Sequence, residues 1–233
     1  MCIRDRLTLI HYTIYPILSF SPGDGGIIPI PTISDAQTAY KNEIVPYDKG
    51  TNFKNMNSCF YTVAMDLFLY GNFQSIKTPR AILYKATAPA NPSSDSSESA
   101  LSIYGNATNI LVWLDPVKND LSVSAILIKN GSKHLSTSPP IENLPIRKPI
   151  RLAVVFTQSF IEVYIDGKLR LTHVLTDLPI EITKGQFYGP ILAAKNSVAV
   201  SNLQYWSYPL SPRQIQANGA PIAKDTLFTT PER

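Results

Sequence analysis

Hydrophobic residues in this chain gather into short runs that have the length and residue types of β-strands. The clearest run, residues 59–70 (CFYTVAMDLFLY), is almost continuously apolar, aromatic or β-branched, which predicts a strand covered on both faces. Further strands are predicted at residues 81–86, 100–104, 110–114, 121–129 and 197–208. Short strands of this kind favour an all-β fold over a helical one.

Residues 149–174 contain the strongest local pattern in the chain. Two predicted strands, 151–156 and 160–165, are followed by Asp166-Gly167 and a third strand at 168–174. Asp-Gly suits a type I′ turn because both central residues need a positive φ. In the second strand, isoleucine and valine alternate with glutamate and tyrosine, so one face is expected to be buried. The segment therefore predicts an antiparallel meander.

The remaining connections are predicted from their turn residues. Residues 115–120 (DPVKND) favour a type I turn that closes a hairpin, and residues 130–132 form a further turn. Residues 87–99 (TAPANPSSDSSES) offer almost nothing to bury and are expected to form a surface loop. Residues 138–149 contain four prolines and are predicted to be a loop that crosses between two sheets.

A short helical turn is expected after the last strand. Ser211 and Gln214 have the spacing of a capping box, and Pro212 falls at the first helical position. Leu210 and Ile215 occupy the two positions of a hydrophobic staple. The pattern predicts one amphipathic turn pinned against the domain.

The two ends of the chain differ from its centre. Residues 1–6 (MCIRDR) resemble translated sequencing-adapter sequence from environmental assemblies, so we expect them to be an artefact. Residues 7–20 are apolar but too short for a bilayer span, which leaves a truncated membrane anchor, a secretory segment or an apolar arm as alternatives. We expect residues 21–40 to be a Pro/Gly linker with a helical turn near its end, residues 41–216 to be one domain, and residues 217–233 to be a flexible tail.

Composition and charge narrow the class of protein. The chain has 233 residues, of which 44% are hydrophobic and 16% charged, with 19 Pro and 11 Gly. This is too apolar for disorder and poor in charge for a helical bundle. Cys2 and Cys59 provide no disulfide framework. The formal net charge is +4, but the basic residues are spread thinly, so nucleic acid is not an expected partner.

Two segments resemble a known family. Residues 151–175 (RLAVVFTQSFIEVYIDGKLRLTHVL) and 200–215 (VSNLQYWSYPLSPRQI) are similar to the "Y-x-D-G-K" hairpin and the closing strand of laminin G-like, concanavalin A-like domains. The resemblance implies a two-sheet antiparallel jelly-roll sandwich. The order of apolar segment, linker and domain is similar to proteins of large nucleocytoplasmic DNA viruses. Ile150 departs from the pattern, because many relatives have Trp there.

Concanavalin A-like folds also include glycoside hydrolases, which need two carboxylates projecting from one face. On the strand face that carries Glu162, the next residue is Tyr164 and the one after it, Asp166, belongs to a turn. Asp177 and Glu181 are separated by a proline, so they are not expected to lie on one strand face. His11, His134 and His173 have no nucleophile motif and no zinc-ligand spacing. The chain is therefore not expected to be an enzyme.

Two kinds of ligand site follow from the resemblance. Relatives often bind calcium at the rim of the sandwich, and Asp115, Asn119 and Asp120 offer oxygen ligands in one turn, although they are also common turn residues. No other cofactor is expected. Sugar binding needs an exposed aromatic ring, for which the candidates are Trp113, Trp206, Tyr104 and Tyr188, each of which is also typical of core packing.

These observations predict a non-catalytic binding or structural module that recognises glycan or protein at the exposed side of a virion or membrane, with a possible tether through the N-terminal segment. Two alternatives stay open. One is a concanavalin A-like glycoside hydrolase, and the other is a ligand-free, capsid-type structural domain.

Overall fold

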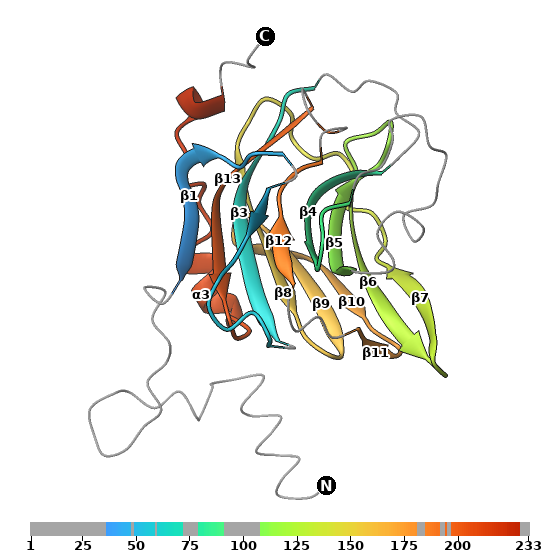
Figure 1. The fold of residues 1–233 in the computed structure, drawn as a ribbon. Coiled ribbons are helices and arrows are strands. Elements are labelled where there is room, and N and C mark those ends of the chain that lie inside the picture. Colours follow the sequence, from blue (N-terminus) through green and yellow to red (C-terminus); the bar gives the residue numbers. More distant parts are fainter. Residues whose placement is uncertain are drawn as a thin grey trace, which may run out of the picture. The chain divides into compact units, whose positions relative to one another are not determined.

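The computed structural model describes residues 36–47, 49–58, 60–71, 79–90, 108–180, 185–191, 194 and 197–228. Their strands form two antiparallel sheets that face each other (Figure 1). Sheet A runs in the order β1 (Gln37–Ile44), β13 (Val198–Trp206), β3 (Tyr61–Leu69), β8 (Ile150–Phe156), β9 (Phe160–Ile165) and β10 (Lys168–Val174). Sheet B runs in the order β11 (Leu178–Pro179), β6 (Leu121–Lys129), β5 (Thr108–Leu114), β4 (Arg80–Ala86), β12 (Gln186–Tyr188) and β2 (Gly50–Thr51), and β7 (Ser132–Thr137) pairs with β6.

The predicted all-β fold of two antiparallel sheets is confirmed, as is a short helix after the last long strand, α3 (Pro212–Ala217). A 3₁₀ helix, η3 (Asp225–Phe228), follows it. Neither of these helices has the length and apolar character needed to cross a membrane, and the same holds for all described residues. The predicted strand at 100–104 and the apolar segment at 7–20 lie outside the described residues.

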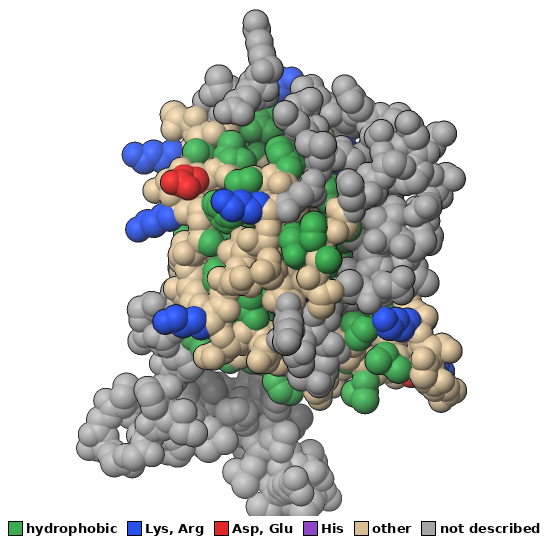
Figure 2. Space-filling model, viewed as in Figure 1, with side chains coloured by type: hydrophobic (Ala, Val, Ile, Leu, Met, Phe, Trp, Pro, Cys, Tyr) green, Lys and Arg blue, Asp and Glu red, His purple; other side chains and the backbone are tan. Residues whose placement is uncertain are grey.

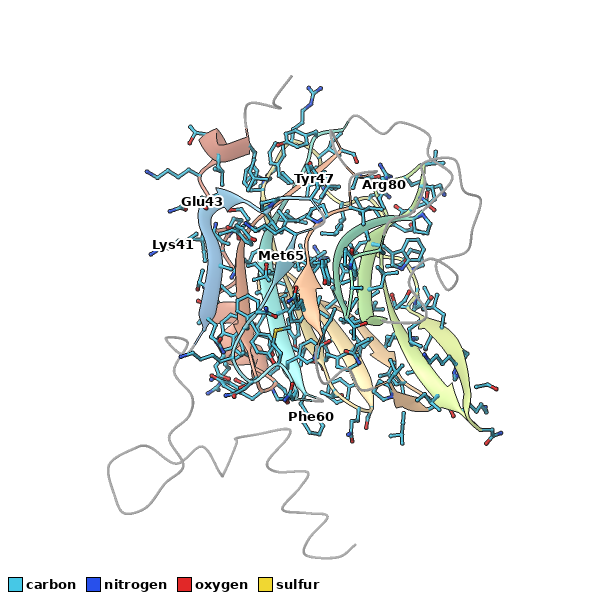
Figure 3. All side chains as sticks on the ribbon, viewed as in Figure 1. Lys41, Glu43, Tyr47, Phe60, Met65 and Arg80 are labelled. Atoms are coloured by element: carbon cyan, nitrogen blue, oxygen red, sulfur yellow. The ribbon has the colours of Figure 1, made fainter. Side chains whose placement is uncertain are left out.

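The core lies between the two sheets. All nine residues of β3 are buried, which confirms the strand predicted to be covered on both faces. Met65 lies between the sheets, whereas Lys41 and Glu43 project away from the sandwich (Figure 3). An aromatic cluster adds packing at one end, where the rings of Tyr61 and Phe156 stack with centroids 5.1 Å apart. Removing this apolar surface from water is the main source of stability.

The predicted meander is confirmed strand by strand in β8, β9 and β10. Asp166 and Gly167 have φ values of 50° and 74°, as a type I′ turn requires. Ile161 and Val163 are fully buried against sheet B, and Tyr164 lies on the opposite face. Local alternation and turn chemistry therefore agree with the tertiary structure at this point.

The boundary predicted for the linker is wrong. Gln37 already belongs to β1, which pairs with β13, so neither a linker that extends to residue 40 nor a helical turn over 37–41 is present. β1 is an edge strand with an irregular register, and Tyr40 and Asn42 have positive φ values. Polar and apolar residues do not alternate clearly along β1, so no local pattern predicts this strand. Its pairing with β13 holds it in place.

Residues 217–228, which were predicted to belong to a flexible tail, are instead packed against sheet A, and residues 229–233 lie outside the described residues. The C-terminal segment, residues 209–228, packs on the face of sheet A that is turned away from sheet B (Figure 1). Its start is held at Thr62, whose Oγ1 accepts a hydrogen bond from the amide of Leu210 at 2.8 Å. Its end is held at Phe228, whose ring stacks on Phe68 with centroids 4.9 Å apart. The predicted capping box between Ser211 and Gln214 is present in α3.

A buried carboxylate fastens the middle of this segment. Asp66 is fully buried, and its Oδ1 accepts a hydrogen bond from Nη1 of Arg151 at 2.9 Å. Its Oδ2 accepts from Nδ2 of Asn202 at 2.7 Å and from the amides of Ile222 and Ala223 at 3.0 and 2.7 Å. One side chain therefore links strands β3, β8 and β13 to the C-terminal segment.

We expect Gly219→Ala to lower the free energy of unfolding by about 1–3 kcal/mol, as overpacking does. A Cβ at Gly219 would lie 2.5 Å from the Cα of Gly167, so the backbone of the β9–β10 turn or of the C-terminal segment must move. Urea unfolding measures the change. Gly131→Asn is the control, because nothing lies within 4 Å of a Cβ there and asparagine tolerates positive φ. Equal stability of the two variants would contradict this close contact.

Candidate functional site

The β5–β6 turn forms one rim of the sandwich and is braced from below by Arg80 at the start of β4. Arg80 is 1% exposed, and its Nε donates a hydrogen bond to the carbonyl oxygen of Asp115 at 3.0 Å. Its Nη2 donates to the carbonyl oxygen of Lys118 at 2.7 Å. Burial lowers the pKa of Arg80 to about 10, with the charge of Asp115 acting in the opposite direction, so the guanidinium is cationic at neutral pH. Figure 3 places Arg80 and Phe60 at opposite ends of the sandwich.

Side-chain and backbone bonds within the turn fix its shape further. Oδ1 of Asp115 accepts hydrogen bonds from the amides of Val117 and Lys118, both at 2.8 Å. An aspartate that bonds to amides two and three residues later is a common way to stabilise a turn. The predicted hairpin turn at residues 115–120 is thus confirmed, with β5 and β6 paired on either side.

The Pro-rich loop after β7 supplies the second wall of the site. Leu121 and Ile141 exchange backbone hydrogen bonds of 2.9 and 2.7 Å. The amide of Asn143 donates to Oδ1 of Asp120 at 3.0 Å, and the amide of Leu144 donates to the carbonyl oxygen of Asn119 at 3.0 Å. The loop and the turn therefore form one braced unit.

Between these two walls lies a hollow of about 290 Å³, which we call the rim hollow. It is lined by Val117, Lys118, Asn119, Asp120, Glu142 and Asn143. Lys118, Glu142 and Asn143 are exposed, and the Lys118 ammonium and Glu142 carboxylate bond to no other residue that the structure describes. Val117, 61% exposed, adds an apolar surface. The rim hollow combines hydrogen-bond donors and acceptors with one apolar contact.

The residues predicted to bind calcium lie beside one another, and one polar side-chain atom of each bonds to the backbone of the turn or of the neighbouring loop. Oδ1 of Asp115 and Oδ1 of Asp120 accept backbone amides, and Nδ2 of Asn119 donates to the carbonyl oxygen of Leu144. The carbonyl oxygens of Asp115 and Lys118 face the Arg80 guanidinium. Across the part of the chain that is described, no three or more His, Cys, Asp or Glu residues gather in one place. Calcium binding stays a prediction.

Two of the predicted aromatic plates are core residues, so their assignment to a sugar site is wrong. Trp206 is 1% exposed and packs under Leu210 and Ile215 of the C-terminal segment. Tyr188 is 5% exposed and stacks on Tyr84 with centroids 5.3 Å apart. Each ring is buried by packing within the protein, so it has no exposed face for a sugar.

The other two aromatic candidates have different outcomes. Trp113 is half-buried against the core, and its Nε1 donates a hydrogen bond to Oγ of Ser124 at 2.9 Å. Tyr104 lies outside the described residues. Trp113 is therefore the one predicted ring that the described part of the chain leaves partly accessible.

Each of the three described carboxylates that were considered for catalysis has a partner of its own. Glu162 accepts a hydrogen bond from the Tyr164 hydroxyl at 2.7 Å, and Asp166 accepts from the amide of Arg151 at 2.8 Å. Asp177 lies 3.4 Å from Nε2 of His134, and Glu181 lies outside the described residues. Glu162, Asp166 and Asp177 are thus engaged in separate local contacts.

Sequence reasoning missed three residues that define the site. Arg80 comes directly before the strand predicted at residues 81–86 and was not singled out, and Glu142 and Asn143 lie in a loop that was described by its prolines alone. A charged residue at the start of an apolar strand is a signal that could have indicated Arg80, because a buried charge must find partners. The contact between the β5–β6 turn and the loop after β7 has no signal in the local sequence of either segment.

Comparison with solved structures finds the same kind of fold in receptor-binding domains of botulinum neurotoxins. The serotype D binding domain aligns with a TM-score of 0.50 and 11% identity over 79% of this chain and 44% of that chain. The receptor-binding domain of the mosaic serotype C/D aligns with a TM-score of 0.50 and 10% identity over 78% and 45%. The chain thus spans less than half the length of these neighbours, and the likeness shows a shared β-sandwich fold.

No protein-family model matches the chain, and a search of curated proteins finds no match either. The structure shows an all-β sandwich with a polar hollow at one rim.

Proposed function

We propose that this sandwich is a non-catalytic module that binds glycan in the rim hollow. The observation that carries the proposal is a hollow of about 290 Å³ in which charged and amide side chains stand on a braced turn. Sugars present many hydroxyl groups, and carboxylate, ammonium and amide groups are the side chains that bond to them most strongly. Val117 offers an apolar contact for a sugar ring.

The rigidity of the site supports binding without a large entropic penalty. Arg80, Asp115 and the two hydrogen bonds between Asn119 and Leu144 hold both walls in place before a ligand arrives. A site that is already ordered loses less conformational entropy when it binds. The ligand then meets Lys118 and Glu142 on a fixed frame.

The names of the solved structures that share this fold support a binding role. The proteins that share the fold are described as receptor-binding or binding domains of neurotoxins. For this chain a receptor or glycan partner is a proposal. The separate engagement of Glu162, Asp166 and Asp177 supports a module without hydrolase activity.

The finer family and the location are part of the same proposal. We infer a laminin G-like subtype from the "Y-x-D-G-K" hairpin, and a virion or membrane surface from the order of the N-terminal segments. Basic side chains stand apart from one another on the face shown in Figure 2, which supports a partner other than nucleic acid.

A glycan array with site variants tests the proposal. We expect wild-type protein to bind at least one class of glycan, and the double variant Glu142→Ala/Asn143→Ala to weaken that binding about 10-fold or more, as loss of charged hydrogen bonds does. Glu43→Ala is the matched control, because Glu43 is an exposed glutamate on β1 and should leave binding unchanged.

Two results would contradict the proposal. One is glycan binding that is unaffected by the double variant but lost in Trp113→Phe. The other is release of reducing sugar from a polysaccharide that disappears in Glu162→Gln. Parallel measurements in calcium and in a chelator show whether the metal contributes.

A further inference from the structure

A narrow space lies behind α3, between the outer face of sheet A and the C-terminal segment, and shares no lining residue with the rim hollow. Its volume is about 10 Å³, which is room for the centre of a single water-sized particle. Arg151, Trp206 and Asn218 line it, and the rest of its wall is made of small or apolar residues, including Ala64 and Leu210.

Three buried nitrogen donors belong to these lining residues. Nε of Arg151, Nε1 of Trp206 and Nδ2 of Asn218 have no hydrogen-bond partner among the described residues. Arg151 and Trp206 are each 1% exposed, so bulk water does not reach them freely. Buried N–H groups without an acceptor are costly and rare in folded proteins.

The nearest carboxylate is already committed elsewhere. Asp66 accepts hydrogen bonds from Nη1 of Arg151, from Asn202 and from the amides of Ile222 and Ala223. Nη2 of Arg151 donates to Oε1 of Gln204. The Nε–H of Arg151 is therefore the part of the guanidinium that these acceptors leave unused.

We propose that this space binds a monoatomic anion, with chloride as the natural ligand. Three of the residues that line the space each have a buried N–H donor without an acceptor, and no carboxylate lines it, so an occupant that accepts hydrogen bonds fits it best. A water molecule has two lone pairs and would leave one donor unpaired, whereas a halide accepts three or more. The volume excludes phosphate, sulfate and carboxylates. The formal net charge of +4 favours an anion further.

Such an anion would cross-link three parts of the chain. Arg151 lies in β8, Trp206 ends β13, and Asn218 caps α3. Binding to the folded state alone raises stability with ligand concentration. Bound chloride and Asp66 would then each connect sheet A to the C-terminal segment. This role does not depend on the function of the rim hollow.

Thermal unfolding of the full chain in sodium chloride and in sodium gluconate at equal ionic strength tests the proposal. We expect Tm to rise with chloride concentration and not with gluconate, and bromide to act like chloride. This dependence is expected to disappear in Trp206→Phe and in Asn218→Ala. Trp113→Phe, which removes an indole N–H on the other sheet, is the matched control and should keep it.

Crystals of the wild-type chain soaked in bromide give a second readout that needs no variant. We expect an anomalous peak within hydrogen-bond distance of the three nitrogen atoms. Identical Tm values in chloride and gluconate, or a water molecule without anomalous signal at this position, would overturn the proposal.

Discussion

Asp66→Asn is expected to lower the free energy of unfolding by about 3–5 kcal/mol, because it leaves the Arg151 guanidinium buried without its counter-charge. The new amide would also place an N–H opposite donors that now bond to the carboxylate, including the amides of Ile222 and Ala223. Urea unfolding followed by circular dichroism measures the change. We also expect the C-terminal segment to become sensitive to protease before the sandwich unfolds.

Two further variants make this prediction specific. Asp177→Asn removes a carboxylate that lies 3.4 Å from His134 in a partly exposed pair, and should change stability by less than about 1 kcal/mol. The double variant Asp66→Asn/Arg151→Met removes both buried charges and should recover part of the loss. A loss in Asp66→Asn no larger than in Asp177→Asn would show that the buried network does not hold the segment.

Trp206→Ala is expected to cost about 3–5 kcal/mol of unfolding free energy, the range for truncating a buried aromatic side chain. The ring is 1% exposed and contacts the cluster that contains Tyr164, Leu210 and Ile215. Denaturant unfolding measures the loss, and the native fraction should retain its ligand binding.

Phe60→Ala is the control for this substitution. Phe60 is 43% exposed, so its truncation should have a much smaller effect on stability. A stable Trp206→Ala protein that has lost glycan binding would mean that the ring meets the ligand, in disagreement with its burial.

Local patterns in the sequence predicted the central strands well. In β8 to β10 the alternation of side chains and the Asp166-Gly167 turn specify the same structure that the tertiary packing selects. β3 was recognisable because nine consecutive buried positions leave little choice other than a strand between two layers. Consistency between local and global preferences explains these successes.

The edges and the ends could not be predicted in this way. β1 is exposed and polar, so its register depends on backbone bonds to β13 that no local pattern encodes. The apolar residues of the C-terminal segment are scattered rather than gathered into a strand-like run, and the segment is held by single anchors such as Phe228 and by the Asp66 carboxylate. A lone aspartate within the apolar run CFYTVAMDLFLY was the available signal, because a buried carboxylate requires partners.

The three residues predicted to bind calcium lie at the turn that lines the rim hollow, and how their polar atoms are used could not be predicted from the sequence. Asp115, Asn119 and Asp120 do lie at a rim, yet their polar atoms mostly stabilise the turn and its neighbouring loop. The exposed groups, Glu142 and Asn143, come from a loop more than twenty positions away in the chain. Residue type alone also could not separate a buried ring from an exposed one, which is why Trp206 was assigned to a ligand.

The most direct test of the central claim is an amide NMR titration of isotope-labelled protein with the glycan that binds most strongly on the array. We predict that chemical-shift changes concentrate at residues 117–120 and 142–144, the two walls of the rim hollow. Changes centred instead on Trp113 and the outer face of sheet B, or no changes at all, would contradict the account.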